Sequence, residues 1–307
     1  MNRIDKKYSG VIVPMITPVS ANYRIDKVSA ASILKTFTFS NVSVFLLGTT
    51  GESTSVLEEE KTVLVETALE SAQNKVDVFA GVSSNCQEET IKISNQYAAM
   101  GVSAVVLHLP FYYPISENQM VGYFKTIADK VDCPVVLYNN PMTVKQSIPV
   151  SVVDELSYHP NIWGFKDSER GLERLDSCIE LWKDRKDFSF LLGWAAQSAY
   201  ALSKGCDGIV PSTGNLVPQW YKKLYTSAIE GNSTAAEHYQ TLTDSVSEVY
   251  QKGRKINESI PALKVIMSEY NLCNPIPIPP MYPPSVEEER ILRENIKEIL
   301  TANSRVE

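Results

Sequence analysis

Short apolar runs rich in valine, isoleucine, leucine and phenylalanine recur along the first two thirds of the chain. Each run is bounded by glycine, proline or polar residues, a pattern that predicts strands buried on both faces. The predicted strands are residues 10–17, 42–48, 76–82, 104–109, 135–138, 162–166, 188–193 and 208–211.

Segments of helical length separate these strands, and the one between the second and third strands has a clear apolar face. That face consists of Leu57, Leu64, Val65, Ala68, Leu69 and Ala72. A capping box of Ser55 and Glu58 predicts where this helix begins. Eight strands that alternate with helices over about 200 residues favour a (β/α)8 TIM barrel over an open sheet, which usually has fewer strands.

The pattern changes after Pro218, where helical stretches follow one another without intervening strands. They are residues 219–230, 234–252, 259–270 and 286–301. Six prolines between Pro275 and Pro284 predict a stiff connector before the last helix, which a second capping box of Ser285 and Glu288 begins. We therefore predict a catalytic barrel over residues 1–218 and a C-terminal helical domain over 219–307, packed on the barrel and on neighbouring subunits.

Composition narrows the classes of partner and compartment. A net charge of −7 over 307 residues argues against nucleic acid or an anionic membrane as the main partner. The chain has no apolar run of transmembrane length, and residues 1–7 lack the apolar core of a signal peptide. The five cysteines are an odd number and never occur as Cys-x-x-Cys, which favours reduced thiols in the cytoplasm.

The sequence offers no recognisable metal or nucleotide site. The three histidines, His108, His159 and His238, are far apart, so a zinc aldolase or metallohydrolase is disfavoured. His108 lies inside a predicted strand, where we expect a structural role. The chain contains neither a Gly-x-Gly-x-x-Gly motif nor a Walker loop, so nothing supports a nucleotide cofactor.

Candidate chemistry gathers at the ends of the predicted strands, where barrel active sites lie. Lys166 ends the sixth strand, and partial burial there would leave a neutral amine able to form a Schiff base, although most lysines are solvated surface groups. The loop Gly48-Thr49-Thr50-Gly51-Glu52 is either a carboxylate nest or a plain glycine turn. Tyr138, at the end of the fifth strand, is either a core tyrosine with a solvated tip or a proton shuttle.

Taken together, these residues resemble the dihydrodipicolinate synthase/N-acetylneuraminate lyase family of class I, Schiff-base-forming aldolases. The resemblance extends along nearly the whole chain. It rests on the start of the first strand (residues 10–18), the Gly-Thr-Thr-Gly-Glu loop, the turn Tyr138-Asn139-Asn140-Pro141, Lys166 and residues 205–210. It implies a (β/α)8 barrel with a C-terminal helical domain, assembled as a homotetramer that is a dimer of dimers.

The resemblance also implies a role for each matching residue. Lys166 is expected to attack the C2 carbonyl of pyruvate or another 2-oxo acid, and Tyr138 to transfer protons at the C–C bond. Thr49 and Thr50 are expected to bind the carboxylate, with Thr50 also passing a proton to Tyr138. Tyr112 is expected to reach the proton relay of a neighbouring subunit.

Two further positions complete the implied site. Gly48 belongs to the carboxylate-binding loop, and Val210 falls where the family places a backbone carbonyl near the keto acid. The iminium formed on the lysine is an electron sink that permits C–C cleavage or formation, or loss of a C4 hydroxyl. Such chemistry needs no metal or organic cofactor.

Departures from the family pattern bear on the substrate. Dihydrodipicolinate synthases carry an arginine two residues after the proline of the Tyr-Asn-x-Pro turn, where it holds the carboxylate of aspartate semialdehyde. Thr143 stands in that place and has no guanidinium fork, and Lys145 is displaced by two residues. This difference weakens the assignment to lysine biosynthesis.

The loop Pro110-Phe111-Tyr112-Tyr113-Pro114 is closer to the sialic acid lyases. Those lyases place acidic residues after the glycine of strand seven, however, and this chain has Ala195 and Ala196. We therefore expect an aldolase or dehydratase for a smaller 2-oxo acid, such as a 2-keto-3-deoxy sugar acid. Ser212, Thr213 and Asn215 either contact its hydroxyls or only shape a loop. A synthase, a sialic acid lyase and a non-enzymatic keto-acid sensor remain the alternatives.

Overall fold

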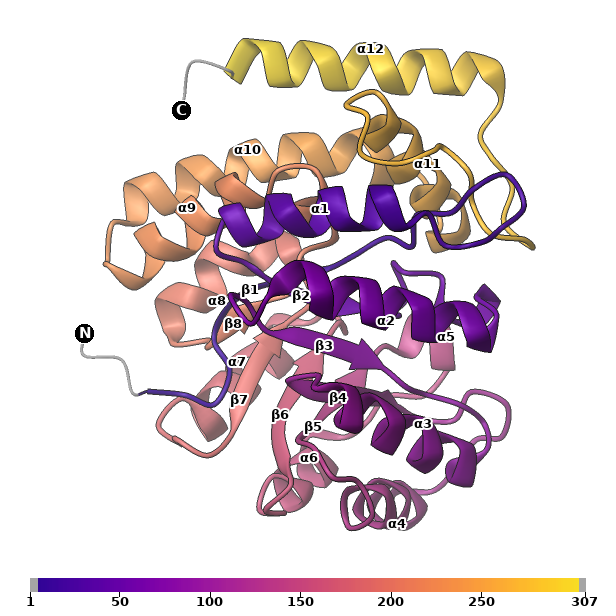
Figure 1. The fold of residues 1–307 in the computed structure, drawn as a ribbon. Helices are drawn as coiled ribbons and strands as arrows, with labels where there is room; N and C mark the ends of the chain where they lie inside the picture. The colour runs from indigo at the N-terminus through magenta and orange to yellow at the C-terminus, as the bar shows by residue number, and fades with distance from the viewer. Residues whose placement is uncertain (1–4, 304–307) are drawn as a thin grey trace.

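The computed structural model describes residues 5–303, and its eight strands form a closed parallel barrel in the order of the chain (Figure 1). The predicted α/β barrel is thus confirmed. We expect no signal peptide in residues 1–7, and residues 1–4 of that segment lie outside the described residues. The strands are β1 (Gly10–Pro14), β2 (Ser43–Leu46), β3 (Val78–Gly81), β4 (Ala104–His108), β5 (Val135–Asn139), β6 (Ile162–Asp167), β7 (Ser189–Leu192) and β8 (Gly208–Ile209).

Helices surround this barrel, which explains why its strands are almost continuously apolar: each strand is covered on its outer face as well. Phe165 on β6, for example, packs edge to face on Trp182, with 5.8 Å between ring centroids. The covering helices are α1 (Lys27–Phe39), α2 (Glu58–Ala72), α3 (Gln87–Met100), α4 (Glu117–Ala128), α5 (Pro141–Val144), α6 (Val150–Leu156), α7 (Leu172–Trp182) and α8 (Ser198–Lys204). The 3-10 turns are η1 (Ser53–Ser55), η2 (Ala195–Gln197) and η3 (Ser212–Asn215).

The inside of the barrel is filled by a separate apolar cluster. Tyr8 fills the amino-terminal end, with its ring centroid 4.8 Å from that of Phe79, while Phe45, Tyr138 and Val210 also belong to this inner cluster. Because side chains close the lower part of the barrel, space for a ligand is left at the carboxyl-terminal ends of the strands.

Only one of the two predicted capping boxes forms. Ser55 lies in η1, and α2 begins at Glu58 without a side-chain cap, so the first box is wrong. The backbone of Ser55 is instead used in a turn, in which its N–H donates to Glu52 O at 2.8 Å. Leu57, expected on the apolar face of this helix, is 52% exposed.

The second capping box forms as predicted. The N–H of Glu288 donates to Ser285 Oγ at 3.3 Å, and the N–H of Ser285 donates to Glu288 Oε2 at 3.0 Å. This reciprocal pair begins the last helix.

The C-terminal helices are α9 (Pro218–Ile229), α10 (Ser233–Gln251), α11 (Ile256–Ser268) and α12 (Val286–Asn303). Helix α9 packs against α8 and β1, and α10 packs against α9. Helix α12 lies at the outer edge of the molecule, in contact with α10 and α11 (Figure 1). The domain boundary at residue 218 stays a prediction, because α9 is in contact with both the barrel and the later helices.

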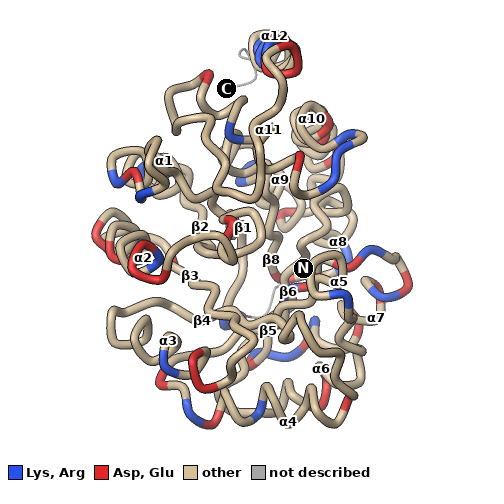
Figure 2. Tube along the Cα trace, turned by 90° about the vertical axis from the view of Figure 1, so that its right-hand side faces the viewer, with Lys and Arg blue, Asp and Glu red and all other residues tan. Residues whose placement is uncertain are grey.

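Charged residues of both signs are interspersed along the outer helices and loops, whereas most of the strand trace is uncharged (Figure 2). Within residues 5–303, none of the helices has the length and apolar content needed to cross a membrane. All five cysteines are free; Cys86 is exposed and the others are buried.

Candidate active site

Lys166 is the penultimate residue of β6 and is only 6% exposed. Its Nζ lies 3.8 Å from the centroid of the Tyr138 ring and 4.6 Å from that of Phe45. Burial has the largest effect on the amine and lowers the pKa of Lys166. The charge of Tyr138 and its hydrogen bond to the amine act in the opposite direction. A lowered pKa leaves more of the amine neutral, and the neutral amine is the form that attacks a carbonyl.

Tyr138, the penultimate residue of β5, lies directly beside Lys166, since the two residues are partners in the β5–β6 register. Its hydroxyl lies 3.1 Å from Thr49 Oγ1 and accepts a hydrogen bond from Asn140 Nδ2 at 3.0 Å. Burial acts to raise the pKa of the phenol, but the charge of Lys166 and hydrogen bonds from Thr49, Ser168 and Asn140 outweigh it, so the pKa is lowered. A phenol of lowered pKa next to an amine can exchange protons with it.

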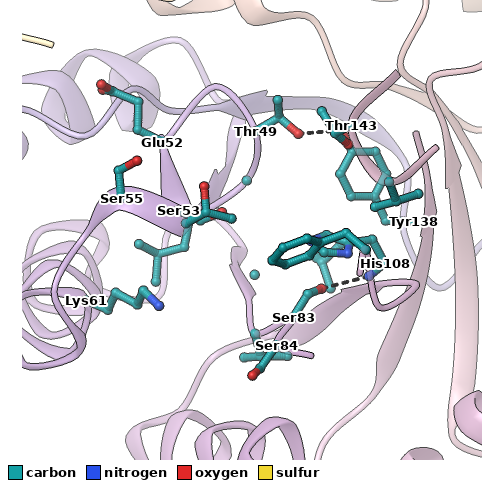
Figure 3. Close-up of a pocket in the computed structure, with 18 of the residues that line it drawn as sticks. Thr49, Glu52, Ser53, Ser55, Lys61, Ser83, Ser84, His108, Tyr138 and Thr143 are labelled. Atoms are coloured by element: carbon teal, nitrogen blue, oxygen red, sulfur yellow. Dashed lines mark hydrogen bonds between the residues drawn. The ribbon is translucent and has the colours of Figure 1, made fainter. Parts of the chain in front are cut away.

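The loop after β2 presents Thr49 to this phenol. The N–H of Gly51 donates to Gly48 O and that of Glu52 to Thr49 O, both at 3.1 Å, which closes a tight turn. A Cβ on Gly48 would lie 2.6 Å from the Phe45 ring, so glycine lets the loop approach the barrel closely. The Thr49 side chain points to Tyr138 in Figure 3.

This arrangement corrects one expected contact. We expected Thr50 to be the proton partner of Tyr138, whereas the hydrogen bond of the phenol is shared with Thr49. Thr50 is half-buried and does not line the cavity at the site. Successive residues of a tight turn direct their side chains differently, and only Thr49 faces the phenol.

A cavity of about 910 Å³ opens over the ends of β2 to β5 (Figure 3). Tyr138, Phe45 and Thr49 line the cavity. The Lys166 amine lies behind this wall, against the rings of Tyr138 and Phe45. Much of the remaining wall carries hydroxyl or amide groups, from Ser53, Thr54, Ser55, Ser83, Ser84, Asn85 and Thr143.

A network behind Lys166 was not predicted from the sequence. The carboxylate of Asp167 accepts hydrogen bonds from Arg174 Nε at 2.6 Å and from Asn139 Nδ2 at 2.9 Å. Burial raises the pKa of Asp167, although Arg174 opposes that shift. The adjacency of Asp167 to Lys166 was the available signal, and the network holds the end of β6 in place.

A buried ion pair anchors the threonine loop to the C-terminal helices, and it too was missed. The side chains of Glu52 and Lys264 are fully buried and form a salt bridge. Ile278 N–H donates to Glu52 Oε1 at 2.7 Å, and Lys264 Nζ donates to Ile276 O at 2.9 Å. Burial raises the pKa of Glu52, while Lys264 opposes the shift. Glu52 therefore ties the loop of Thr49 to α11 and to the proline-rich connector.

Thr143, which stands where an arginine is expected in a dihydrodipicolinate synthase, lies in the cavity wall. Thr143 Oγ1 donates to Asn140 O at 3.1 Å. Lys145 is exposed, donates to Met142 O at 3.2 Å and does not line the cavity. It therefore does not occupy the place of the arginine that dihydrodipicolinate synthases are expected to carry.

The loop after β8 is held by contacts within the fold. The hydroxyls of Ser212 and Thr213 lie 2.8 and 2.9 Å from Tyr250 OH, and Asn215 Nδ2 donates to Pro14 O at 2.8 Å. These contacts support the structural alternative for all three residues. Val210 lies in the inner barrel cluster, and its N–H donates to Leu192 O at 2.7 Å.

Tyr112 lies outside the cavity of its own chain. Its side chain is 73% exposed and meets the Tyr113 ring edge to face, with 4.9 Å between centroids. The N–H groups of Phe111 and Tyr112 donate to Asn85 Oδ1 at 2.9 and 3.3 Å, which fixes the loop. Phe111 reaches the cavity wall, whereas Tyr112 points to no group of the site described here.

A closed parallel barrel with a buried lysine, a phenol and a threonine loop at its carboxyl-terminal mouth has the arrangement of an aldolase-type lyase. Residues 7–299 match the model of the dihydrodipicolinate synthetase family. The chain belongs to this family and is a lyase of the aldolase type. Membership in a family of enzymes disfavours the keto-acid sensor.

Two relatives show how broad the family is at this level of identity. The chain is 34% identical over 247 residues to the 4-hydroxy-tetrahydrodipicolinate synthase of Pseudoalteromonas atlantica. The aligned region covers 79% of this chain and 83% of that protein. It is 29% identical over 270 residues to Escherichia coli YagE, whose name proposes 2-dehydro-3-deoxy-D-gluconate aldolase activity, with 87% of each chain covered.

Solved structures agree with the fold. The crystal structure of YagE in complex with pyruvate has a TM-score of 0.89 at 25% identity, covering 95% of this chain and 98% of that one. A dihydrodipicolinate synthase from Aquifex aeolicus has a TM-score of 0.87 at 24% identity, with coverages of 95% and 98%. The second similarity concerns the fold alone.

Proposed function

We propose that the protein is a Schiff-base-forming lyase that acts on pyruvate or a related 2-oxo acid, with a 2-keto-3-deoxy sugar acid as the substrate that is cleaved. The observation that carries the proposal is the contact of the Lys166 amine with the Tyr138 ring, together with the hydrogen bond between the same phenol and Thr49. A nucleophile and a proton-transfer group thus lie side by side, as Schiff-base chemistry requires.

In the proposed reaction, neutral Lys166 attacks C2 of the 2-oxo acid, and the hydroxyl of the resulting carbinolamine takes up a proton from the solvent and leaves as water, which gives an iminium. Tyr138, in its phenolate form, takes the proton of the C4 hydroxyl, the C3–C4 bond breaks, and its electron pair moves into the iminium to give an enamine and an aldehyde. Protonation of the enamine at C3 and hydrolysis then release pyruvate and free lysine. The Thr49 hydroxyl relays the proton away from Tyr138.

We assign the carboxylate of the substrate to the turn of Gly48, Thr49 and Thr50, because backbone N–H groups of such a turn can bind an anion and Gly48 and Thr49 line the cavity. The backbone carbonyl of Val210 borders the keto acid in this proposal. Val210 and Tyr138 belong to the same cluster inside the barrel, which supports the assignment.

The lining of the cavity supports a polyhydroxylated substrate. No arginine of residues 5–303 lines the cavity, and its lysine, Lys61, is paired with Glu58 at 3.0 Å. Hydroxyl and amide groups are thus better placed than cations to meet the distal part of the substrate. A 4-hydroxy-tetrahydrodipicolinate synthase is the second candidate, favoured by the relative in Pseudoalteromonas atlantica, and Thr143 argues against it.

We also propose that the site is shared within a homotetramer built as a dimer of dimers. Tyr112 and Tyr113 expose large aromatic area on the loop after β4, and such area is typical of protein interfaces. The five free cysteines support a cytoplasmic location, where thiols stay reduced.

Borohydride trapping with pyruvate tests the proposal. Reduction of the imine should add a pyruvate-derived mass to the peptide that contains Lys166. Lys61→Ala, which removes the lysine of the cavity wall, is the matched control and should still be labelled. Labelling of another lysine, or none while pyruvate binds, would refute the proposal. A panel of 2-keto-3-deoxy sugar acids, N-acetylneuraminate, and pyruvate with aspartate semialdehyde then separates the candidate substrates.

A further inference from the structure

His108 lies in the cavity wall, although the sequence favoured a purely structural role for it. It ends β4 and is the register partner of Tyr138 on β5. Its ring centroid lies 6.4 Å from that of Tyr138 and 6.4 Å from that of Phe111. Figure 3 shows it on the wall of the cavity, with its backbone N–H donating to Ser83 Oγ at 2.8 Å.

The hydrogen bonds of His108 define which ring nitrogen is left for a ligand. Nδ1 lies 2.6 Å from Leu109 O, and because a carbonyl can only accept, Nδ1 carries the proton. Burial lowers the pKa of His108 despite that bond, and the charge of Lys166 lowers it further, which favours the neutral imidazole. Nε2 is then an acceptor, and no residue of 5–303 donates a hydrogen bond to it.

Three neighbouring strands present three groups in one row at the barrel mouth. Lys166 on β6 is the register partner of Tyr138 on β5, which is the register partner of His108 on β4. In the proposed reaction Lys166 holds C2 and Tyr138 meets the C4 hydroxyl. A substrate chain that continues in the same direction directs its C5 hydroxyl toward His108. Adjacent strands lie about 4.8 Å apart, and neighbouring hydroxyls on C4 and C5, each with a hydrogen bond of about 2.8 Å to its side chain, can span that gap.

We propose that His108 determines specificity by accepting, through Nε2, a hydrogen bond from a hydroxyl on C5 of the substrate. The inference rests on the proposed function and narrows it: the aldehyde partner carries a hydroxyl next to its carbonyl. A residue that only packed would need no free acceptor, and an apolar side chain would serve equally well between Tyr138 and Phe111.

Condensation of pyruvate with small aldehydes tests this role. Glyceraldehyde and lactaldehyde carry the hydroxyl that becomes the C5 group, whereas 3-hydroxypropanal and propanal lack it. In His108→Phe, kcat/KM for the first two should fall about three- to ten-fold, mainly through KM, as expected for one lost neutral hydrogen bond. The values for the last two should fall by a clearly smaller factor, so that the preference for the hydroxylated aldehydes shrinks.

Conservative variants separate recognition from folding. In His108→Gln the amide oxygen can reach the place of Nε2, so the preference for lactaldehyde over propanal should be largely retained, whereas the shorter His108→Asn should lose it. This comparison holds even if His108→Phe does not fold. His159→Gln is the control for replacing a histidine, since His159 pairs with Asp129 at 3.0 Å, away from the cavity.

The outcomes distinguish the two proposals. If every aldehyde loses the same factor in the His108 variants, or if the preference for lactaldehyde persists in His108→Asn, the role of His108 is refuted while the proposed function stands. If the parent protein forms the pyruvate adduct but condenses none of the aldehydes, the proposed function fails, and the role of His108 fails with it.

Discussion

The Nζ of Lys166 lies 3.8 Å from the centroid of the Tyr138 ring, and the two residues are partners in the register of β5 and β6. Each changes the titration of the other, because Lys166 lowers the pKa of the phenol and Tyr138 raises that of the amine. A change at either residue should therefore alter the behaviour of the pair.

Tyr138→Phe should lose most turnover while the imine still forms. It removes the proton-transfer hydroxyl but keeps the ring against Lys166, and general acid–base groups typically contribute about 10²–10⁴-fold. Steady-state rates and borohydride trapping would be measured on the same sample. Turnover within a few-fold of the parent would mean that Tyr138 is a packing residue.

Formation of the pyruvate adduct should slow as the pH falls through the pKa of Lys166, because only the neutral amine attacks. Since burial lowers this pKa, the midpoint should lie below the ordinary lysine value of about 10.4. In Tyr138→Phe the midpoint should move to lower pH, because a group that raises the pKa is lost. Trapping rates measured against pH check both statements, and a midpoint at or above the ordinary value would contradict them.

Condensation of pyruvate with aspartate semialdehyde should be poor, because Thr143 cannot hold the second carboxylate. One lost hydrogen bond to a charged group is worth roughly 1.5–3 kcal/mol, or one to two decades in kcat/KM. Thr143→Arg should raise this activity. A parent value of about 10⁵ M⁻¹s⁻¹ or more, ordinary for a good enzyme, would favour the synthase instead. Lys145 would then be the first residue to test as a substitute for the missing arginine.

Tyr112 should act in the site of a neighbouring subunit. Mixing Tyr112→Phe subunits with Lys166→Ala subunits tests this, because each variant alone should be nearly inactive while a hybrid dimer regains one complete site. Subunit exchange is verified by mass before activity is measured. An absence of recovery would show that Tyr112 acts within its own chain or has no part in the reaction.

Glu52→Gln should destabilise the fold, because it leaves Lys264 charged and buried without its partner. Breaking such a pair costs about 3–5 kcal/mol of unfolding free energy. The double variant Glu52→Gln with Lys264→Met should recover much of that loss, and denaturant unfolding measures both. Glu287→Gln, on an exposed pair with Arg290, is the control and should change little. A single variant as stable as the parent would mean that the ion pair does not hold the loop of Thr49.

Several features of the site are local, and local features can be predicted. Lys166 and Tyr138 were identified because each ends a short apolar run, and in a parallel barrel the ends of such runs meet at one mouth. The cap of α12 was predicted because Ser285 and Glu288 satisfy each other within one helical turn. The boundaries of the C-terminal helices followed from the same short-range periodicity.

Other features depend on which distant residues meet. Ser55 carries the same signature as Ser285, yet its backbone is used in the turn that follows the threonine loop, so α2 starts without its cap. The pairing of Glu52 with Lys264 joins positions more than two hundred residues apart, and no local pattern marks it. The choice of Thr49 over Thr50 depends on the direction of side chains within one tight turn.

The barrel, a lysine at the end of its sixth strand and a tyrosine beside that lysine could be predicted from the sequence, because hydrophobic periodicity and strand ends are properties of neighbouring residues. The fold was needed to show that Thr49 and Tyr138 share a hydrogen bond, that Glu52 anchors its loop to α11, and that His108 lies in the cavity wall. Those relations arise from the closure of the barrel, which brings strand ends and helices together in directions that no single segment specifies.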